Sequence, residues 1–357
     1  MTNRRVFYHG EGRIGKLPQM NEPKKDEPPG SQPGQLDEVS PASPGSSGFE
    51  LTKLSPFEAW TQKIFIGRGG LRPIWRIVLY LILYRGLRFC LYVLIAYGLP
   101  DVSRLWLQTA AELGLAIIVL LPALLMARIE DRRFGCYGLP AANAFGRLFW
   151  VGALWGMGSL TVLMLALRGA HVFYFGAIAL HGLRLLKFAV FWAVFFLIVG
   201  FYEEFFTRGY TQFTLTESVG FWPAAILLSL GFGALHLENP GEDWVGILAA
   251  MMIGFFFCLT LRRTGNLWFA VGFHAAWDWG ESYFYSVPNS GWTPPGHLLH
   301  SSLQGPRWLS GGSVGPEGSV FLFVLLALLW VVFDRMYPEV KCPPTNEIAD
   351  PRLQISD

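Results

Sequence analysis

Two adjacent carboxylates, Glu203 and Glu204, lie inside an apolar segment of the sequence. They follow the hydrophobic run from Leu185 to Gly200, which has the composition of a membrane-spanning helix. An ionisable residue inside a membrane costs about 2.5–3.5 kcal/mol on insertion scales, so an adjacent pair needs partners or a chemical function. Arg208 stands four residues after Glu204 on the same helix face, and we predict an ion pair between them. Glu203 is then the free carboxylate.

Two later apolar segments supply imidazole groups and a further carboxylate. His236 ends the run that begins at Ser229, and His274 precedes Asp278 by four residues, hence on one helix face. A buried carboxylate and an imidazole can together deprotonate a water molecule and return the proton to a leaving amine. A second imidazole, held by a carboxylate one turn on, can donate to the developing oxyanion. The set therefore predicts amide hydrolysis within a membrane.

The same residue types leave a metal-dependent route open. One Glu and two His form a ligand set of catalytic zinc sites, in which a metal-bound water is the nucleophile. The four cysteines include no Cys-x-x-Cys pair and indicate neither a zinc ribbon nor a disulfide framework. The cofactor is left undetermined, with a divalent metal such as zinc as one option, and we favour the route through carboxylate and imidazole alone.

Composition sets the class of the protein. The chain has 357 residues, of which 52% are hydrophobic and 15% charged, and its mean hydropathy is +0.36. These values are typical of a polytopic membrane protein. The net charge of +2 gives no sign of nucleic-acid binding, so the expected partners are the lipid bilayer and a membrane-associated peptide or protein substrate. Since a crossing needs about 20 residues, we predict an all-α bundle of about eight transmembrane helices, near residues 75–98, 105–127, 145–167, 185–214, 219–238, 245–262, 265–285 and 317–337.

The chain divides into segments of different composition. Residues 1–70 are predicted to form a disordered cytoplasmic tail, because this region is rich in Pro, Gly and Ser and has little apolar periodicity. Residues 71–180 hold the first transmembrane helices, 181–285 the catalytic core, and 317–357 the last helix and a C-terminal tail. The loop at 286–316 is long enough for a lid over a site, but its composition favours a solvated linker.

Arginines mark alternate ends of the predicted spans. Under the positive-inside rule the Arg-rich ends are cytoplasmic, which places both termini in the cytoplasm. Arg168, Arg184 and Lys187 fall at the other ends and oppose this orientation. The Arg-rich ends carry Arg68, Arg72, Arg76, Arg128, Arg132, Arg133, Arg147, Arg262, Arg263 and Arg335.

Helix length limits how the two groups that would activate water can meet. At about 1.5 Å per residue, Glu203 lies about 27 Å along its helix from Leu185, and His236 about 25 Å from Val219. Straight helices with these bounds would leave the two near opposite faces of the bilayer. They meet if the fourth helix continues past Arg208, or if the fifth helix is short or tilted. We predict the first arrangement.

Three motifs, taken in order, resemble those of the CPBP family, which includes type II CAAX prenyl endopeptidases and related bacteriocin-processing and immunity proteins. The resemblance covers about residues 185–285 and implies an intramembrane endopeptidase. Asp278, at the last motif position, is a variant that resembles bacterial members, so the implied location is the bacterial cell membrane. The motifs are Glu203-Glu204-x-x-x-Arg208, Phe232-x-x-x-His236 and His274-x-x-x-Asp278.

The resemblance also implies roles for the motif residues. Asp278 stands where the prenyl endopeptidases commonly have Asn, and an ionised Asp is a poor donor to an oxyanion. We therefore expect it to orient His274 or to be protonated in a dry site. The other implied roles are water activation by Glu203 and His236, support by Glu204 and Arg208, and oxyanion stabilisation by His274.

Two other classes of protein remain open. A non-catalytic membrane immunity or scaffold protein would keep the polar cluster only to specify helix packing. A proton-coupled transporter would use the ionisable residues as a relay, although no inverted repeat relates the two halves of the sequence. The substrate is also open, including whether it is a prenylated CAAX protein.

Overall fold

The computed structural model describes residues 55–67, 70–98, 102–239 and 241–342. Residues 1–53 make up a separate unit outside this range, so the predicted disorder cannot be compared there. Within the predicted tail, however, the structure has helix α1 (Pro56–Phe65) and an antiparallel pair of two-residue strands, β1 (Ile66–Gly67) and β2 (Gly70–Leu71). The prediction of disorder up to residue 70 is therefore wrong for α1, whose amphipathic spacing was overlooked.

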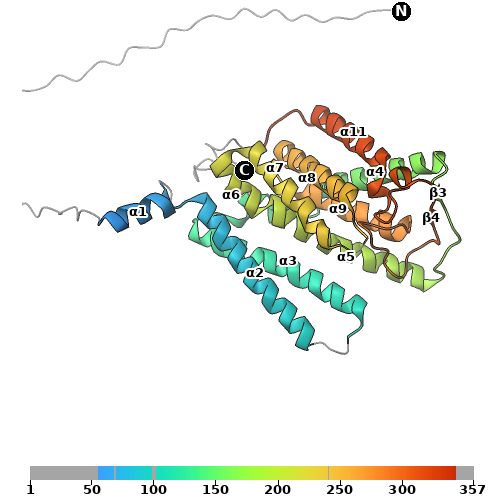
Figure 1. Cartoon of the computed structure of the whole chain (residues 1–357), viewed down its shortest axis with the longest axis horizontal. Coiled ribbons are helices and arrows are strands. Elements are labelled where there is room, and N and C mark those ends of the chain that lie inside the picture. The colour runs from blue at the N-terminus through green and yellow to red at the C-terminus, as the bar shows by residue number, and fades with distance from the viewer. Residues whose placement is uncertain (1–54, 68–69, 99–101, 240, 343–357) are drawn as a thin grey trace, which may run out of the picture. The chain divides into compact units, whose positions relative to one another are not determined.

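Helices make up most of the described chain, which confirms the all-α membrane fold (Figure 1). The longer ones are α2 (Pro73–Gly98), α3 (Arg104–Ile129), α4 (Arg147–Gly169), α5 (Leu183–Arg208), α6 (Tyr210–Val219), α7 (Phe221–Leu235), α8 (Trp244–Thr264), α9 (Trp268–Trp279) and α11 (Val320–Met336). The remaining strands are the antiparallel pair β3 (Phe173–Tyr174) and β4 (Ser302–Leu303). Short helical turns connect the rest: η1 (Phe134–Tyr137), η2 (Ala141–Asn143), η3 (His236–Glu238), η4 (Gly280–Phe284), α10 (Arg307–Ser310) and η5 (Pro316–Gly318).

Six helical segments of the described chain are long and apolar enough to cross a membrane. They are α2, α3, α4, α5 with α6, α7 with η3, and α8. The prediction of about eight spans is corrected here, because α9 has only 12 residues and α11 only 17. At about 1.5 Å per residue, α9 is about 18 Å long, well short of the hydrocarbon thickness. Its residues are almost all buried, so its apolar character reflects packing within the protein.

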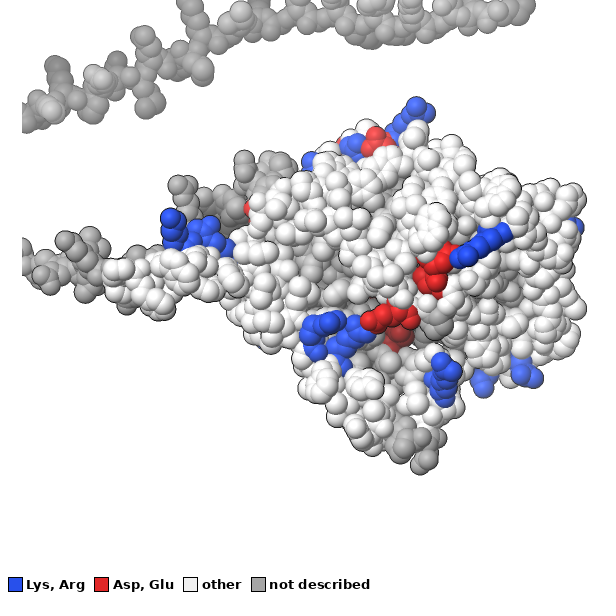
Figure 2. All heavy atoms as spheres, in the orientation of Figure 1, with Lys and Arg blue, Asp and Glu red and all other residues white. Residues whose placement is uncertain are grey.

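The outer surface of the bundle fits a lipid environment. Large hydrophobic side chains such as Leu124, Leu154 and Leu328 are exposed on three different helices. Lys, Arg, Asp and Glu interrupt the visible face at only a few places (Figure 2). Extended apolar surface of this kind marks a membrane contact, and the chain is an integral membrane protein.

The short helix α9 lies in the interior because α4 approaches it closely. Gly156 of α4 faces the backbone of α9, where an added Cβ would overlap the carbonyl oxygen of Phe273. Small residues of this kind allow two helix backbones to touch. His274 directly follows Phe273 in α9. The contact between α4 and α9 therefore fixes how deep the imidazole of His274 lies in the bundle.

The fourth membrane segment continues past Arg208 to Val219, as predicted, with a bend at Gly209. Helix α5 ends at Arg208, and α6 begins at Tyr210. Gly209 between them has φ −82° and ψ −124°, outside the helical region, and glycine is among the poorest helix formers. The fifth segment is also short, as in the second arrangement considered above: α7 has only 15 residues and ends at Leu235, immediately before His236.

The Arg-rich ends gather at one end of the bundle. Arg76 at the start of α2 pairs with Glu130 after α3 and with Glu217 in α6, and Arg263 at the end of α8 pairs with Asp334 near the end of α11. In Figure 1, α6 lies at the left of this bundle and the strands β3 and β4 at the right. We refer to the α6 side as the Arg-rich end and keep the prediction that it is cytoplasmic.

Cysteine labelling tests this orientation. Ser313 and Arg335 are exposed and stand before and near the end of α11, hence toward opposite ends of the bundle. In a background without Cys90 and Cys136, we expect a membrane-impermeant maleimide to label Ser313→Cys in intact cells and Arg335→Cys only after lysis. The reverse pattern would contradict the positive-inside assignment.

Candidate active site

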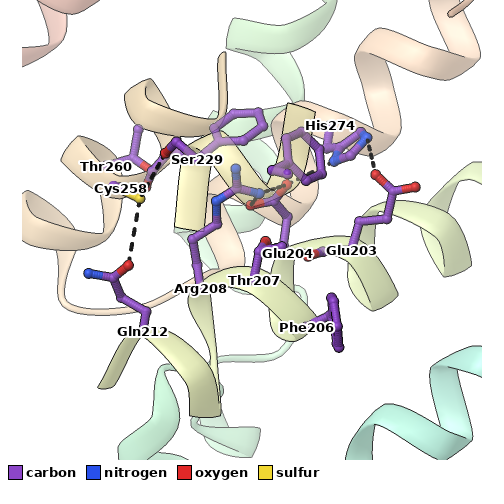
Figure 3. Close-up of polar contacts among 12 residues, drawn as sticks. Glu203, Glu204, Phe206, Thr207, Arg208, Gln212, Ser229, Cys258, Thr260 and His274 are labelled. Atoms are coloured by element: carbon purple, nitrogen blue, oxygen red, sulfur yellow. Dashed lines mark hydrogen bonds and ion pairs between the residues drawn. The ribbon is translucent and has the colours of Figure 1, made fainter. Parts of the chain in front are cut away.

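The first motif forms a fully buried ion pair. Nη1 of Arg208 donates to both carboxylate oxygens of Glu204 at 3.1 Å, as predicted, and neither side chain is exposed (Figure 3). The guanidinium also lies 4.3 Å from the centre of the Phe232 ring, a cation–π distance. Gly254 of α8 provides the space, because an added Cβ there would overlap Nη2 of Arg208. The charge of Glu204 is thus held by contacts from α5, α7 and α8.

His274 stands between three carboxylates. Its Nδ1 is 2.9 Å from Oε1 of Glu204, and because an ionised carboxylate only accepts, Nδ1 carries the proton. Its Nε2 is 3.4 Å from Oδ2 of Asp278 and 3.8 Å from Oε2 of Glu203. Figure 3 shows Glu203 and Glu204 reaching His274 from the same helix. The ion pair with Arg208 therefore fixes the imidazole and aims Nε2 away from Glu204.

His236 occupies the turn η3 at the end of α7. Its Nδ1 is 2.9 Å from the carbonyl oxygen of Phe232, so Nδ1 donates and Nε2 is left with a lone pair. In the described part of the chain, no hydrogen bond or ion pair joins His236 to Glu203 or Glu204. Glu203 and His236 instead line the same space.

That space is a cavity of about 330 Å³. Four of the predicted residues line it: Glu203, His236, His274 and Asp278. Glu204 and Arg208 lie behind this wall, where they support His274. The structure thus brings all six predicted residues to one place. Apolar side chains of α5 and α8, such as Phe195, Phe196 and Phe257, complete the wall.

Sequence reasoning missed a polar row on α3. Arg104, Gln108 and Glu112 also line the cavity. They recur every four residues, which places them on one helix face. Polar residues at this spacing inside an apolar span were a usable signal that this face of α3 contacts other polar groups.

Sequence reasoning also missed residues of the long loop. Asn289, Ser290 and Trp292 line the cavity, together with Glu317 of η5. The interpretation of residues 286–316 as a solvated linker is therefore wrong for this part of the loop, which folds back over the site. Polar residues are common in loops rich in Gly and Pro. The sequence around these residues therefore gave no signal that they line the cavity.

The arrangement does not fit a metal centre. In the ranges that the structure describes, no three His, Cys, Asp or Glu side chains are placed to hold a metal ion. Nδ1 of His274 is hydrogen-bonded to Glu204, and that of His236 to a carbonyl oxygen, which leaves the Nε2 atom of each ring without these partners. We derive no chemical step through a metal.

The fold and the cavity define an integral membrane protein in which buried carboxylates and imidazoles from several helices meet. Residues 185–280 match the family model of the type II CAAX prenyl endopeptidases, described as Rce1-like. The resemblance inferred from the sequence is confirmed for this segment, and the match is consistent with a CPBP family intramembrane protease. No curated protein and no solved structure matches the chain significantly. The matched range runs from α5 into η4 and contains all six predicted residues.

Removing the guanidinium tests the buried ion pair. Breaking a buried pair leaves an uncompensated charge, so Arg208→Met should lower the free energy of unfolding by about 3–5 kcal/mol. The matched control is Arg263→Met, whose partner Asp334 is partly exposed, and a change below about 1 kcal/mol is expected there. Thermal unfolding in detergent measures both. Equal losses in the two variants would show that burial of Glu204 does not depend on Arg208.

Proposed function

We propose that the protein is an intramembrane endopeptidase that hydrolyses a peptide bond of a membrane-associated substrate. The observation that carries the proposal is the meeting of Glu203, His236 and His274 around one cavity within the Rce1-like domain. Each group offers an atom that peptide hydrolysis requires: a carboxylate that Arg208 does not pair, an imidazole lone pair and a second imidazole nitrogen at the same cavity.

The first step is attack by water. Glu203 and His236 both line the cavity, and a water held between them can lose a proton to either group. Its oxygen then bonds to the carbonyl carbon of the substrate as the carbonyl π bond breaks. The proton passes to the leaving nitrogen, the C–N bond breaks, and the products are a carboxylic acid and an amine.

The second requirement is stabilisation of the oxyanion. Nε2 of His274 points into the cavity and donates when the ring carries two protons, a charge that the surrounding carboxylates complement. Glu204 and Arg208 act through His274 by holding its Nδ1. They are positioning residues in this mechanism.

The cavity suits part of a peptide with apolar side chains. Its volume of about 330 Å³ is at the small end of the range for ligand pockets, which is about 300–1,000 Å³. Aromatic side chains of α5 and α8 supply its apolar wall. A CAAX-type substrate, which carries a prenyl chain on Cys, is one candidate of this character.

The side of the membrane separates candidate substrates. The lining residues that lie in loops and in η5 come from the end of the bundle opposite the Arg-rich end: Asn239, Asn289, Ser290, Trp292 and Glu317. If the Arg-rich end is cytoplasmic, substrates reach this cavity from the other side or through the membrane. Prenylated cytoplasmic proteins can reach this cavity from the aqueous phase only in the opposite orientation, so the labelling of Ser313→Cys also tests this route of access.

Loss of the groups that activate water tests the function. We expect Glu203→Gln and His236→Ala each to lower kcat by about 10²–10⁴-fold, the usual contribution of a general base. Cleavage is measured in detergent micelles on fluorescent peptides that carry a farnesylated CAAX end and on unprenylated apolar peptides.

The matched control is Glu238→Gln, an exposed carboxylate two residues after His236. It should retain wild-type activity, and all three variants should keep the wild-type thermal midpoint within a few degrees. Full activity in both Glu203→Gln and His236→Ala would overturn the proposal and favour a membrane scaffold or immunity protein.

A further inference from the structure

Asp278 leaves the proposed oxyanion site short of a donor. An ionised carboxylate has no hydrogen to donate. In the structure Oδ2 of Asp278 is 3.4 Å from Nε2 of His274, and Oδ1 accepts from Nδ2 of Asn289 at 3.0 Å. The carboxylate therefore lies between an imidazole and an amide, both of which line the cavity.

Asn289 is presented by a tight and well-anchored turn. Its N–H donates to the carbonyl oxygen of Trp292 at 2.9 Å, and Trp292 N–H donates back at 2.8 Å. Between them, Ser290 and Gly291 have φ +43° and +80°, the positive pair that a two-residue hairpin turn of type I′ requires. This geometry fixes the direction in which the Asn289 side chain leaves the backbone.

Two contacts hold the turn against the bundle. The backbone N–H and the hydroxyl of Ser290 donate to Oε2 of Glu317 at 2.8 and 2.9 Å, and Gly291 N–H donates to the carbonyl oxygen of Val314 at 3.0 Å. Burial raises the pKa of Glu317, and the Asp278 carboxylate raises it further, while the Ser290 donors lower it. The turn is thus fixed before any substrate arrives.

A primary amide nitrogen has two N–H groups. One N–H of Asn289 is used by Asp278, and the second is available to an atom inside the cavity that Asn289 lines. Gln108 and Asn239 also line the cavity, but in the described chain neither is hydrogen-bonded to His274 or Asp278. Asn289 is therefore the amide best placed beside Nε2 of His274.

We propose that Asn289 is a catalytic residue that donates its second N–H to the oxyanion, beside Nε2 of His274, and that Asp278 positions both donors. The inference rests on the proposed endopeptidase function. As water bonds to the carbonyl carbon, the π electrons move to the carbonyl oxygen, and Asn289 stabilises that charge without transferring a proton. Its hydrogen bond weakens again when the C–N bond breaks.

Substitution at Asn289 tests the proposal. Removal of one oxyanion donor typically costs about 10²–10³-fold in kcat, and we expect this loss in Asn289→Ala with KM nearly unchanged. Because Asp278→Asn places an amide next to His274, the double variant Asp278→Asn/Asn289→Ala should regain about tenfold or more of the lost kcat. The control is Gln304→Ala, which removes an exposed amide of the same loop and should behave as wild type.

If Asn289→Ala does not fold, the exchange variant Asp278→Asn/Asn289→Asp provides a second test of the proposal. It keeps one amide and one carboxylate at the two positions, whereas Asn289→Asp alone puts two carboxylates together. We expect the exchange to restore most of the kcat that Asn289→Asp loses.

Two results would overturn the role of Asn289. One is a kcat within about threefold of wild type in folded Asn289→Ala, and the other is an exchange variant no better than Asn289→Asp alone. If Glu203→Gln still abolishes cleavage in the same assay, only the inference about Asn289 fails. If Glu203→Gln cleaves normally, the proposed function itself fails.

Discussion

The site depends on burying the charge of Glu204 beside Arg208. An isolated carboxylate in the interior of a membrane protein is strongly unfavourable, and a buried pair is tolerated only when further contacts satisfy it. Here Arg208 donates to both oxygens, Phe232 covers the guanidinium, and Gly254 leaves room for it. Glu204 can then accept from His274, which orients the imidazole. The geometry of the cavity therefore follows from one ion pair.

Short helices complete the arrangement. A full-length α7 would have carried His236 away from Glu203, but α7 ends after 15 residues. Helix α9 is shorter still and is buried against α4, so that His274 enters from the interior. The polar groups are thereby collected from helix ends and a loop, while long apolar helices such as α3 separate them from lipid.

Local regularities explain what the sequence could predict. The ion pair between Glu204 and Arg208 follows from their spacing on one helix, and the apolar segments follow from composition. The bend at Gly209 was missed because hydropathy continues across it, and the burial of α9 was missed because apolar residues look alike in lipid and in a protein core. Asn289 was missed because its contact with Asp278 depends on a turn held by Glu317, which no local pattern records.

The central claim is that Glu203 and His236 share one water. An experimental structure in lipid nanodiscs, at a resolution that shows ordered water, tests it most directly. The account predicts one water within about 3 Å of both the Glu203 carboxylate and Nε2 of His236, with Nε2 of His274 facing the same space. Glu203 and His236 separated by packed side chains, or placed near opposite faces of the bilayer, would contradict it.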